Sequence, residues 1–201
     1  MFERSVKPLV KSMVTGKSST VLVTGPLKSR NNKMLYRLNP EGMLMQIYGC
    51  AKELVGMLKK GGKYAKKDFV LKAKGFNIVG ELKTDIFALN PLDPSSMKQK
   101  SLKLESKQDM IEFCKICRNS ISVIRAALQR ADIEKEIIQC IQLTFEVKDG
   151  ETVFQQSTLS VIKANTSEET CTSKNLESFN ICLHNSILAK YSFSLTKVHE
   201  V

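Results

Sequence analysis

The densest run of chemically active side chains in this sequence is basic. Eight lysines lie between residues 52 and 74, and only Glu53 and Asp68 oppose them. They are Lys52, Lys59, Lys60, Lys63, Lys66, Lys67, Lys72 and Lys74. Lysine is a compact point charge, so the run favours diffuse contact with phosphates or lipid headgroups over bidentate reading of bases. The sequence therefore predicts an anion-binding surface, and the alternative is a solvated face that keeps the protein soluble.

Aromatic side chains lie among these lysines. Tyr64, Phe69 and Phe76 would allow single-stranded bases to stack on the basic surface. A second basic group lies near the N-terminus, where apolar residues from Phe2 to Val14 recur at helical spacing. Its cations are Arg4, Lys7 and Lys11. A basic amphipathic helix is typical of membrane surfaces, although the apolar stripe could equally dock on the rest of the domain.

Two other motifs carry less chemistry. Gly16-Lys17-Ser18 would need a glycine five positions before Gly16 to form a phosphate-binding loop, and that position is Lys11. Cys114 and Cys117 form a CxxC motif, but a structural zinc site needs four ligands and the sequence has only two histidines. We therefore expect both cysteines to pack in the core as small hydrophobic residues.

No catalytic arrangement emerges from the nucleophiles. Cys182 and His184 would lie on one face of a strand with side chains about 7 Å apart, too far for a direct hydrogen bond. The acidic residues are scattered and form no evident pair. The sequence thus predicts a protein that is not an enzyme and that holds no cofactor and no metal.

The overall composition of the 201 residues is that of a soluble globular protein, with 42% hydrophobic and 25% charged residues. The net charge is +11, and it is unevenly distributed. Residues 1–100 hold 19 basic and 7 acidic side chains, whereas residues 101–201 hold 12 and 13. An anionic partner is therefore expected to bind the first half.

The predicted location is intracellular, in the cytoplasm, at an inner membrane surface or in a virion. No stretch approaches the length of apolar sequence that spans a membrane, and the N-terminus lacks the apolar core of a signal peptide. The six cysteines are then free thiols of a reducing compartment.

Hydrophobic periodicity predicts an α+β fold of mixed helices with an antiparallel C-terminal sheet of about four strands. Helices are expected at 5–14, 43–60, 108–130 and 132–140. Strands are expected at 20–24, 34–38, 141–147, 152–162, 179–183 and 187–195, with two or three more between 69 and 89. Residues 1–33 would form a basic arm with an amphipathic helix. Residues 34–201 would form the core, and a linker at 90–100 would divide it into two lobes.

Residues 179–187, Phe-Asn-Ile-Cys-Leu-His-Asn-Ser-Ile, resemble a hairpin in the matrix proteins of rhabdoviruses, which are negative-strand RNA viruses. The order of strand, helix ending near Gly62-Lys63 and strand between Met34 and Leu71 is also similar to the core of that family. The resemblance implies a small, basic, non-enzymatic protein that associates with membranes, self-assembles and bridges nucleocapsid and envelope. No functional residue is transferred from it.

These observations predict a structural, matrix-like protein. It would bind an anionic membrane surface or a nucleocapsid, and it would form a homo-oligomer through an edge strand at 187–196. The alternative is a viral accessory protein that binds single-stranded RNA or another nucleic acid. In both interpretations, the anion would be bound by the eight lysines of residues 52–74 together with Arg4, Lys7 and Lys11.

Overall fold

The computed structural model describes residues 2–26, 34–38, 41–62, 64–93, 100–130 and 133–166. The chain divides into two compact units, Met1–Asn165 and Thr166–Val201, and all but the first residue of the second lie outside the described residues. The expected divisions after residue 33 and near 90–100 fall at segments 27–33 and 94–99, which also lie outside them. The expected strands at 179–183 and 187–195, and with them the expected edge strand, also lie outside the described residues.

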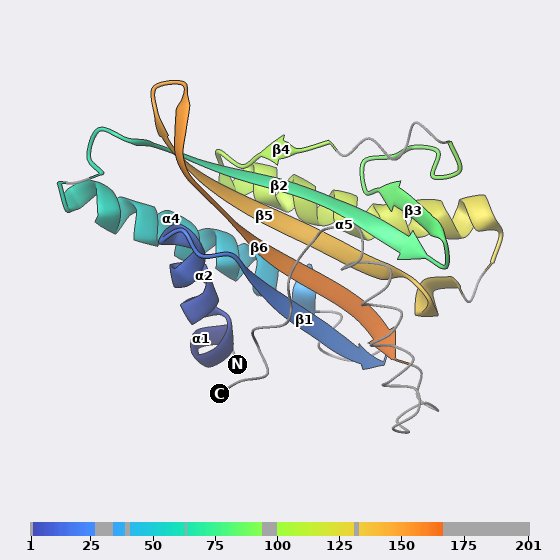
Figure 1. The fold of residues 1–201 in the computed structure, drawn as a ribbon. Coiled ribbons are helices and arrows are strands. Elements are labelled where there is room, and N and C mark those ends of the chain that lie inside the picture. The colour runs from blue at the N-terminus through green and yellow to red at the C-terminus, as the bar shows by residue number, and fades with distance from the viewer. Residues whose placement is uncertain are drawn as a thin grey trace. The chain divides into compact units, whose positions relative to one another are not determined.

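A six-stranded sheet forms the centre of the first unit. Its strands are β1 (Ser19–Pro26), β2 (Asp68–Val79), β3 (Leu82–Asp85), β4 (Leu102–Lys103), β5 (Ile138–Asp149) and β6 (Thr152–Thr166). The spatial order is β1-β6-β5-β2-β3, and β4 also pairs with β2. The pairs of β2 with β3, β4 and β5, and of β5 with β6, are antiparallel, whereas β1 runs in the same direction as β6 (Figure 1). The α+β prediction is confirmed, and the sheet is mixed rather than wholly antiparallel.

The two longest strand pairings follow from the sequence pattern. Asp149 and Gly150 form the hairpin turn between β5 and β6, and Gly150 takes a φ of 60°, which glycine adopts without steric cost. On β5, Ile141, Leu143 and Phe145 are buried at every second position. This alternation places one face of the sheet toward a hydrophobic core.

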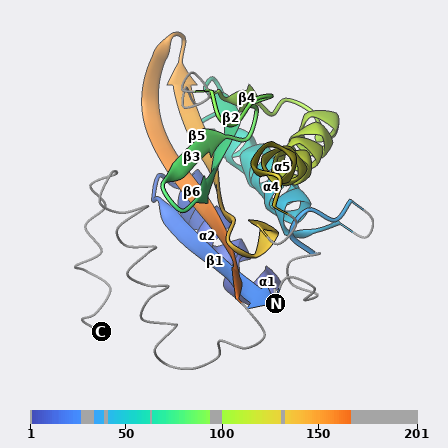
Figure 2. The ribbon, with the colours of Figure 1, turned by 90° about the vertical axis from the view of Figure 1, so that its right-hand side faces the viewer.

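Helices cover that face of the sheet. They are α1 (Phe2–Ser5), α2 (Lys7–Val14), α4 (Met43–Lys60) and α5 (Lys107–Leu128), followed by the short 3₁₀ helix η2 (Ile133–Lys135). Figure 2 shows α4 and α5 on the same side of the sheet, and side chains of α2, α4 and α5 join one buried cluster with those of β2, β5 and β6. The predicted helices at 43–60 and 108–130 are confirmed. Pro8 lies at the start of α2, where its missing N–H costs no hydrogen bond.

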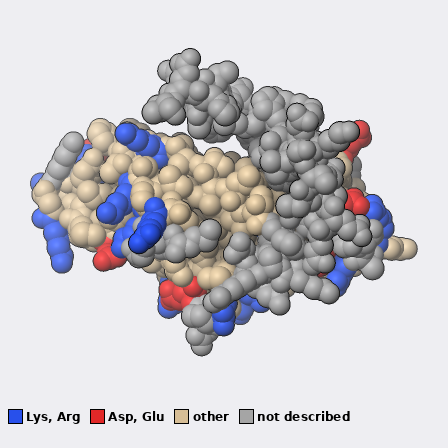
Figure 3. All heavy atoms as spheres, turned by 90° about the horizontal axis from the view of Figure 1, so that it is seen from below, with Lys and Arg blue, Asp and Glu red and all other residues tan. Residues whose placement is uncertain are grey.

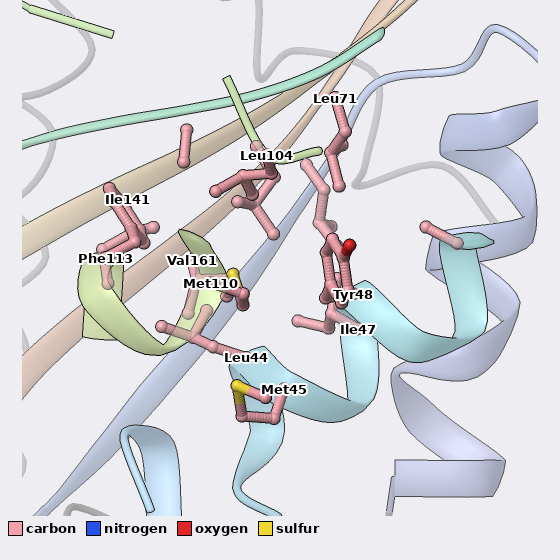
Figure 4. Packing of buried hydrophobic residues seen from close by; sticks show 14 of the residues in the cluster. Leu44, Met45, Ile47, Tyr48, Leu71, Leu104, Met110, Phe113, Ile141 and Val161 are labelled. Carbon is pink, nitrogen blue, oxygen red and sulfur yellow. The ribbon is translucent and has the colours of Figure 1, made fainter. Parts of the chain in front are cut away.

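The core lies between α4, α5 and the sheet (Figure 4). Leu44 and Ile47 of α4 pack there with Phe113 of α5, Ile141 of β5 and Val161 of β6. Cys114 and Cys117 are fully buried in the same cluster, so the prediction that they pack in the core is confirmed.

Helix α5 begins with a capping box. The Asp109 backbone N–H donates to Ser106 Oγ at 3.2 Å, and the Ser106 backbone N–H donates to Asp109 Oδ2 at 2.7 Å. These bonds satisfy backbone groups that a helix start would leave unpaired. The hydrogen bonds from the backbone lower the pKa of the Asp109 carboxyl.

Two local predictions are wrong. Residues 34–38 form a helical turn rather than a strand, because Leu35 and Tyr36 are successive buried residues and do not alternate. Residues 132–140 contain only η2, and β5 already begins at Ile138, where it pairs with Ile78 of β2. Between residues 69 and 89 two strands form, one long and one short, which agrees with the two or three expected, and Ile86 packs in the core instead of starting a third.

No described helix is long and apolar enough to cross a membrane.

Two glycines test this packing. A Cβ at Gly75 of β2 would lie 2.9 Å from the Cys140 carbonyl oxygen and 3.1 Å from Ile86 Cδ1, whereas a Cβ at Gly56 of α4 would meet nothing within 4 Å. Gly75→Ala should lower the free energy of unfolding by about 1–3 kcal/mol. Gly56→Ala should raise it by about 0.5–1 kcal/mol, because alanine favours the helix. Urea unfolding measures both, and a harmless Gly75→Ala would contradict the close approach of β2 and β5.

Candidate functional site

Four of the predicted lysines lie around the point where α4 ends. Lys59 and Lys60 occupy the last turn of α4, and Lys66 and Lys67 lie in the segment that leads into β2. We call these four residues the basic end. Figure 3, seen from below, shows basic side chains gathered toward the left, where α4 ends in Figure 1. Lys63 belongs to the same stretch of sequence but lies outside the described residues.

Aromatic rings accompany the basic end. Lys59 Nζ lies 5.7 Å from the centroid of the Phe69 ring, and Lys67 Nζ lies 5.6 Å from that of Phe154. The Phe154 side chain, near the start of β6, is 61% exposed. Lys67 also forms an ion pair with Asp149 in the β5–β6 turn. Lys60 and Lys66 are exposed, and no contact with another described residue occupies their charges.

The other lysines of residues 52–74 do not join this group. Lys52 Nζ donates to the Glu105 carbonyl oxygen at 3.1 Å, two turns before the end of α4. Lys72 forms an ion pair with Glu146 at 2.8 Å. Lys74 lies further along β2, on the sheet face opposite the helices.

The aromatic stacking platform is not formed as the sequence suggested. Phe76 is buried in the sheet, and Phe69 is half-buried, with its ring centroid 5.7 Å from that of Phe145. Both rings are therefore used in packing, and Phe76 is unavailable for a base.

The N-terminal basic residues lie on different elements from the basic end. Arg4 is on α1, and Lys7 and Lys11 are on α2. The apolar stripe of α2 is buried in the core, with Val10 and Met13 fully inaccessible. This is the docking alternative that the sequence left open, and it removes the apolar face that membrane insertion would need.

A second polar arrangement escaped the sequence analysis. The pairing of β2, β5 and β6 places Asn77, Gln139 and Lys163 side by side across three strands, on the face that the helices cover. We call these three residues the polar row. Gln139 Nε2 donates to Asn77 Oδ1 at 2.8 Å and to the Cys117 carbonyl oxygen at 2.9 Å. Tyr36 donates its hydroxyl to Gln139 Oε1.

Lys163 is the ionisable member of the polar row. Only 6% of its surface is exposed, and its Nζ lies 5.7 Å from the centroid of the Tyr36 ring. No hydrogen bond or ion pair joins its ammonium group to the described part of the chain. Burial lowers the pKa of Lys163, and the charge of Glu134 on η2 partly opposes that shift. Burial of most of the lysine side chain therefore disfavours its charged form.

The buried thiols offer no nucleophile. Burial raises the pKa of Cys114 to about 11 and that of Cys140 to about 12, and it raises the pKa of Cys117 still more clearly. The thiolate is the reactive form, so these three cysteines are inert near neutral pH. No group of three or more His, Cys, Asp or Glu side chains gathers for a metal within the described ranges. Cys182 and His184 lie outside those ranges.

The fold is that of kinesin motor domains. A fast kinesin, described in terms of its ATPase mechanism and its interactions with microtubules, matches 90% of this chain and 55% of its own chain, with a TM-score of 0.65 and 14% identity. The Drosophila kinesin family member NOD in complex with AMPPNP matches 100% of this chain and 63% of its own, with a TM-score of 0.63 and 15% identity. The Saccharomyces cerevisiae Kar3 motor domain matches 98% of this chain and 64% of its own, with a TM-score of 0.61 and 18% identity.

This chain therefore spans between about half and two thirds of the length of those solved chains. No protein-family model matches it, and no curated protein matches it. At such low identity the likeness establishes the fold alone.

The comparisons correct three predictions. The resemblance to rhabdovirus matrix proteins is wrong, because the fold is that of kinesin motor domains. The prediction of a matrix-like or RNA-binding viral protein is wrong with it. The exclusion of an enzyme is also wrong, because it rested on missing His and carboxylate motifs, whereas the fold is shared with motor ATPases. Phosphoryl transfer depends mainly on positioning and charge.

The sequence analysis missed a partial phosphate-loop pattern at the end of β1. A phosphate-binding loop follows a strand, with the pattern Gly-x-x-x-x-Gly-Lys-Ser/Thr. Gly25 lies at the end of β1 and is the first residue of such a frame. Gly16-Lys17-Ser18, which drew attention instead, precedes β1: Gly16 has a φ of 97° in the turn after α2.

The residues of that frame do not fit a magnesium nucleotide of the usual kind. In the frame that Gly25 opens, Arg30, Asn31 and Asn32 replace the second glycine, the lysine and the hydroxyl residue. Phosphate-loop enzymes hold Mg²⁺ with that hydroxyl residue and an acidic residue. Strand β6 lies beside β1 in the sheet. The buried ionisable side chain near the end of β6 is Lys163, a base rather than an acidic residue.

The burial of Lys163 should affect the stability of the fold. Lys163→Met should raise the free energy of unfolding at pH 7, because it removes a charged group whose pKa is lowered by burial. Because the native pKa is lowered, the unfolded chain binds more protons between the two pKa values, so wild-type stability should increase with pH in that window.

The measurement is urea unfolding of both proteins from pH 7 to 10, in a buffer free of phosphate. The gap between the proteins should narrow as pH rises. A variant less stable than wild type at every pH would show that the ammonium group is well satisfied in the native state.

Proposed function

We propose that this chain is a kinesin-like motor-homology domain that docks on the acidic surface of a microtubule through its basic end. The observation that carries the proposal is the gathering of Lys59, Lys60 and Lys66 around the end of α4, on a fold shared with kinesin motor domains. We choose a microtubule as the partner because the fast kinesin of the same fold is described by its interactions with microtubules. Complementary charge would steer the encounter and make it dependent on salt.

A protein surface suits the basic end better than a lipid surface. The apolar face of α2 is buried, so Lys7 and Lys11 have no exposed apolar face on their own helix for insertion. The exposed Phe154 ring beside Lys67 instead supplies an aromatic contact of the kind enriched in protein interfaces.

The basic end is also less suited to nucleic acid than to a protein surface. Non-specific binding of single strands needs a row of open aromatic platforms along a basic groove. Phe76 is buried and Phe69 packs against Phe145 and Tyr64, so the rings that the sequence suggested are occupied. Binding to an anionic lipid surface and binding to nucleic acid or nucleoprotein stay predictions, and both are competing outcomes of the test below. Formation of a homo-oligomer also stays a prediction.

The proposed location is inside the cell, where such a filament is found. The four described cysteines are free and buried, which accords with a reducing compartment.

Co-sedimentation with microtubules tests this function directly. The variant Lys59→Gln, Lys60→Gln, Lys66→Gln should bind about tenfold more weakly than wild type, and wild-type binding should weaken as salt screens the charges. The matched control is Lys100→Gln, Lys115→Gln, Arg125→Gln, which removes the same charge from exposed positions near β4 and on α5. That control should keep most of the affinity.

Equal losses in the two triple variants would mean that only net charge matters and would contradict the assignment to the basic end. Binding to anionic vesicles or to single-stranded RNA without binding to microtubules would overturn the proposed partner.

A further inference from the structure

The edge of β2 that faces away from β5 is paired along most of its length, and the start of the strand is the exception. Phe76–Val79 pair with β3, and Lys72 and Ala73 pair with β4. The Leu104 backbone N–H then donates to the Leu71 carbonyl oxygen at 2.8 Å. Figure 1 shows β2 continuing past the short β4 toward its own start. No strand of the described residues pairs with this edge before Leu71, so β2 has a short open edge there.

The hydrogen bond at Leu71 fixes which backbone groups face the open edge. In an antiparallel strand the N–H and C=O of one residue point to the same side, and those of alternate residues share that side. The Leu71 carbonyl points toward β4, so the N–H and C=O of Phe69 also point away from β5. No backbone hydrogen bond from the described ranges takes up these two groups. Phe69 therefore presents one donor and one acceptor to an added strand.

A cavity of about 510 Å³ lies at this open edge. Its volume falls within the range of about 300–1,000 Å³ that is common for ligand sites. It is lined by Asp68–Leu71 of β2, Lys52 of α4, Lys103–Glu105 at β4 and Lys148 of β5. The chain leaves the edge of β2 after Leu104, because α5 begins close behind, and the cavity occupies the place that a longer β4 would fill.

The α4 side of the cavity is basic. Lys52 Nζ donates to the Glu105 carbonyl oxygen at 3.1 Å, and an ammonium group has three donors. Lys59, two turns later on α4, has its Nζ 5.7 Å from the centroid of the Phe69 ring. Three lysines and two carboxylates line the cavity, and the Glu105 carboxylate is already paired with Lys103 at 2.5 Å. The charge of the cavity therefore favours a strand that carries carboxylates.

We propose that this cavity binds an acidic peptide segment of a partner protein, which adds to the sheet as a short strand antiparallel to β2. The peptide backbone would bond the N–H and C=O of Phe69, and its carboxylates would lie against Lys52 and Lys59. Peptides that add to a sheet edge gain affinity from main-chain hydrogen bonds and specificity from alternate side chains. Lys59 also belongs to the basic end, whereas Lys52 does not, so variants of Lys52 test this proposal separately from microtubule docking.

Fluorescence polarisation of the full chain with a labelled peptide of alternating valine and glutamate residues tests the site. The peptide should bind, and its counterpart with lysine in place of glutamate should not. Two N-methylated forms of the peptide probe the backbone contact, because methyl groups on alternate amides block only one edge of a strand. One form should lose at least tenfold in affinity, and the other should bind nearly as well as the parent peptide.

Lys52→Gln should weaken peptide binding by about three- to fivefold, the effect of one exposed ion pair. The matched control is Lys115→Gln, which removes an exposed charge from α5 and should bind the peptide as wild type does. Microtubule co-sedimentation of Lys52→Gln should match wild type, so this proposal can fail while the docking proposal stands.

Hydrogen exchange followed by NMR gives a second readout. The Phe69 amide should exchange quickly in the free protein and at least tenfold more slowly when the peptide saturates the site. The Val70 amide, which points to β5, should be protected in both states.

Equal affinities of the two methylated forms would show that charge alone holds the peptide and would overturn strand addition. Unchanged exchange at Phe69 in the presence of bound peptide would do the same, as would the absence of peptide binding at millimolar concentration. Protection of Phe69 that rises with protein concentration without peptide would assign the open edge to a second copy of this chain and would overturn the proposed partner.

Discussion

The continuous register of β2, β5 and β6 is the constraint on which the rest of the structure depends. Eleven residue pairs join β2 to β5, from Asp68 with Lys148 to Ile78 with Ile138. The β5–β6 hairpin continues the same alignment, apart from a bulge after Val147. A slip of one residue would exchange the two faces of a strand. It would bring the outward side chains into the core and break the polar row.

The same strands carry both candidate sites, one at each end. Strand β2 starts beside the basic end and reaches Asn77 of the polar row, and β6 starts beside Phe154 and reaches Lys163. At about 3.3 Å per residue, the eight-residue step from Phe69 to Asn77 covers roughly 25 Å. The two sites are thus well separated, and each rests on elements held by the common core of α2, α4 and α5.

Much of the local structure could be predicted because it depends on neighbouring residues. The Ser106–Asp109 capping box, the Asp149-Gly150 turn and the helix at 43–60 are all set by short-range rules. The errors occur where tertiary packing decides. Tyr36 lies in a helical turn because its hydroxyl binds Gln139 and its carbonyl binds Arg118, two partners distant in sequence.

The candidate sites show the same contrast between features set by neighbouring residues and features set by tertiary packing. The lysines of the basic end were evident from their density, but the sequence could not reveal that Lys72 pairs with Glu146 or that Phe76 is buried. Lys163 was missed because it is a single lysine in an otherwise ordinary strand. Its importance follows only from burial and from the register that places it beside Gln139. Neither quantity can be read from composition or spacing.

The central claim is that the register of β2, β5 and β6 buries the Lys163 side chain in the polar row. Its pKa can be measured by NMR titration of lysine labelled with ¹³C at Cε, assigned with the Lys163→Met variant. We expect a pKa below that of the exposed lysines, because burial disfavours the charged form. A pKa equal to that of the exposed lysines would contradict the account.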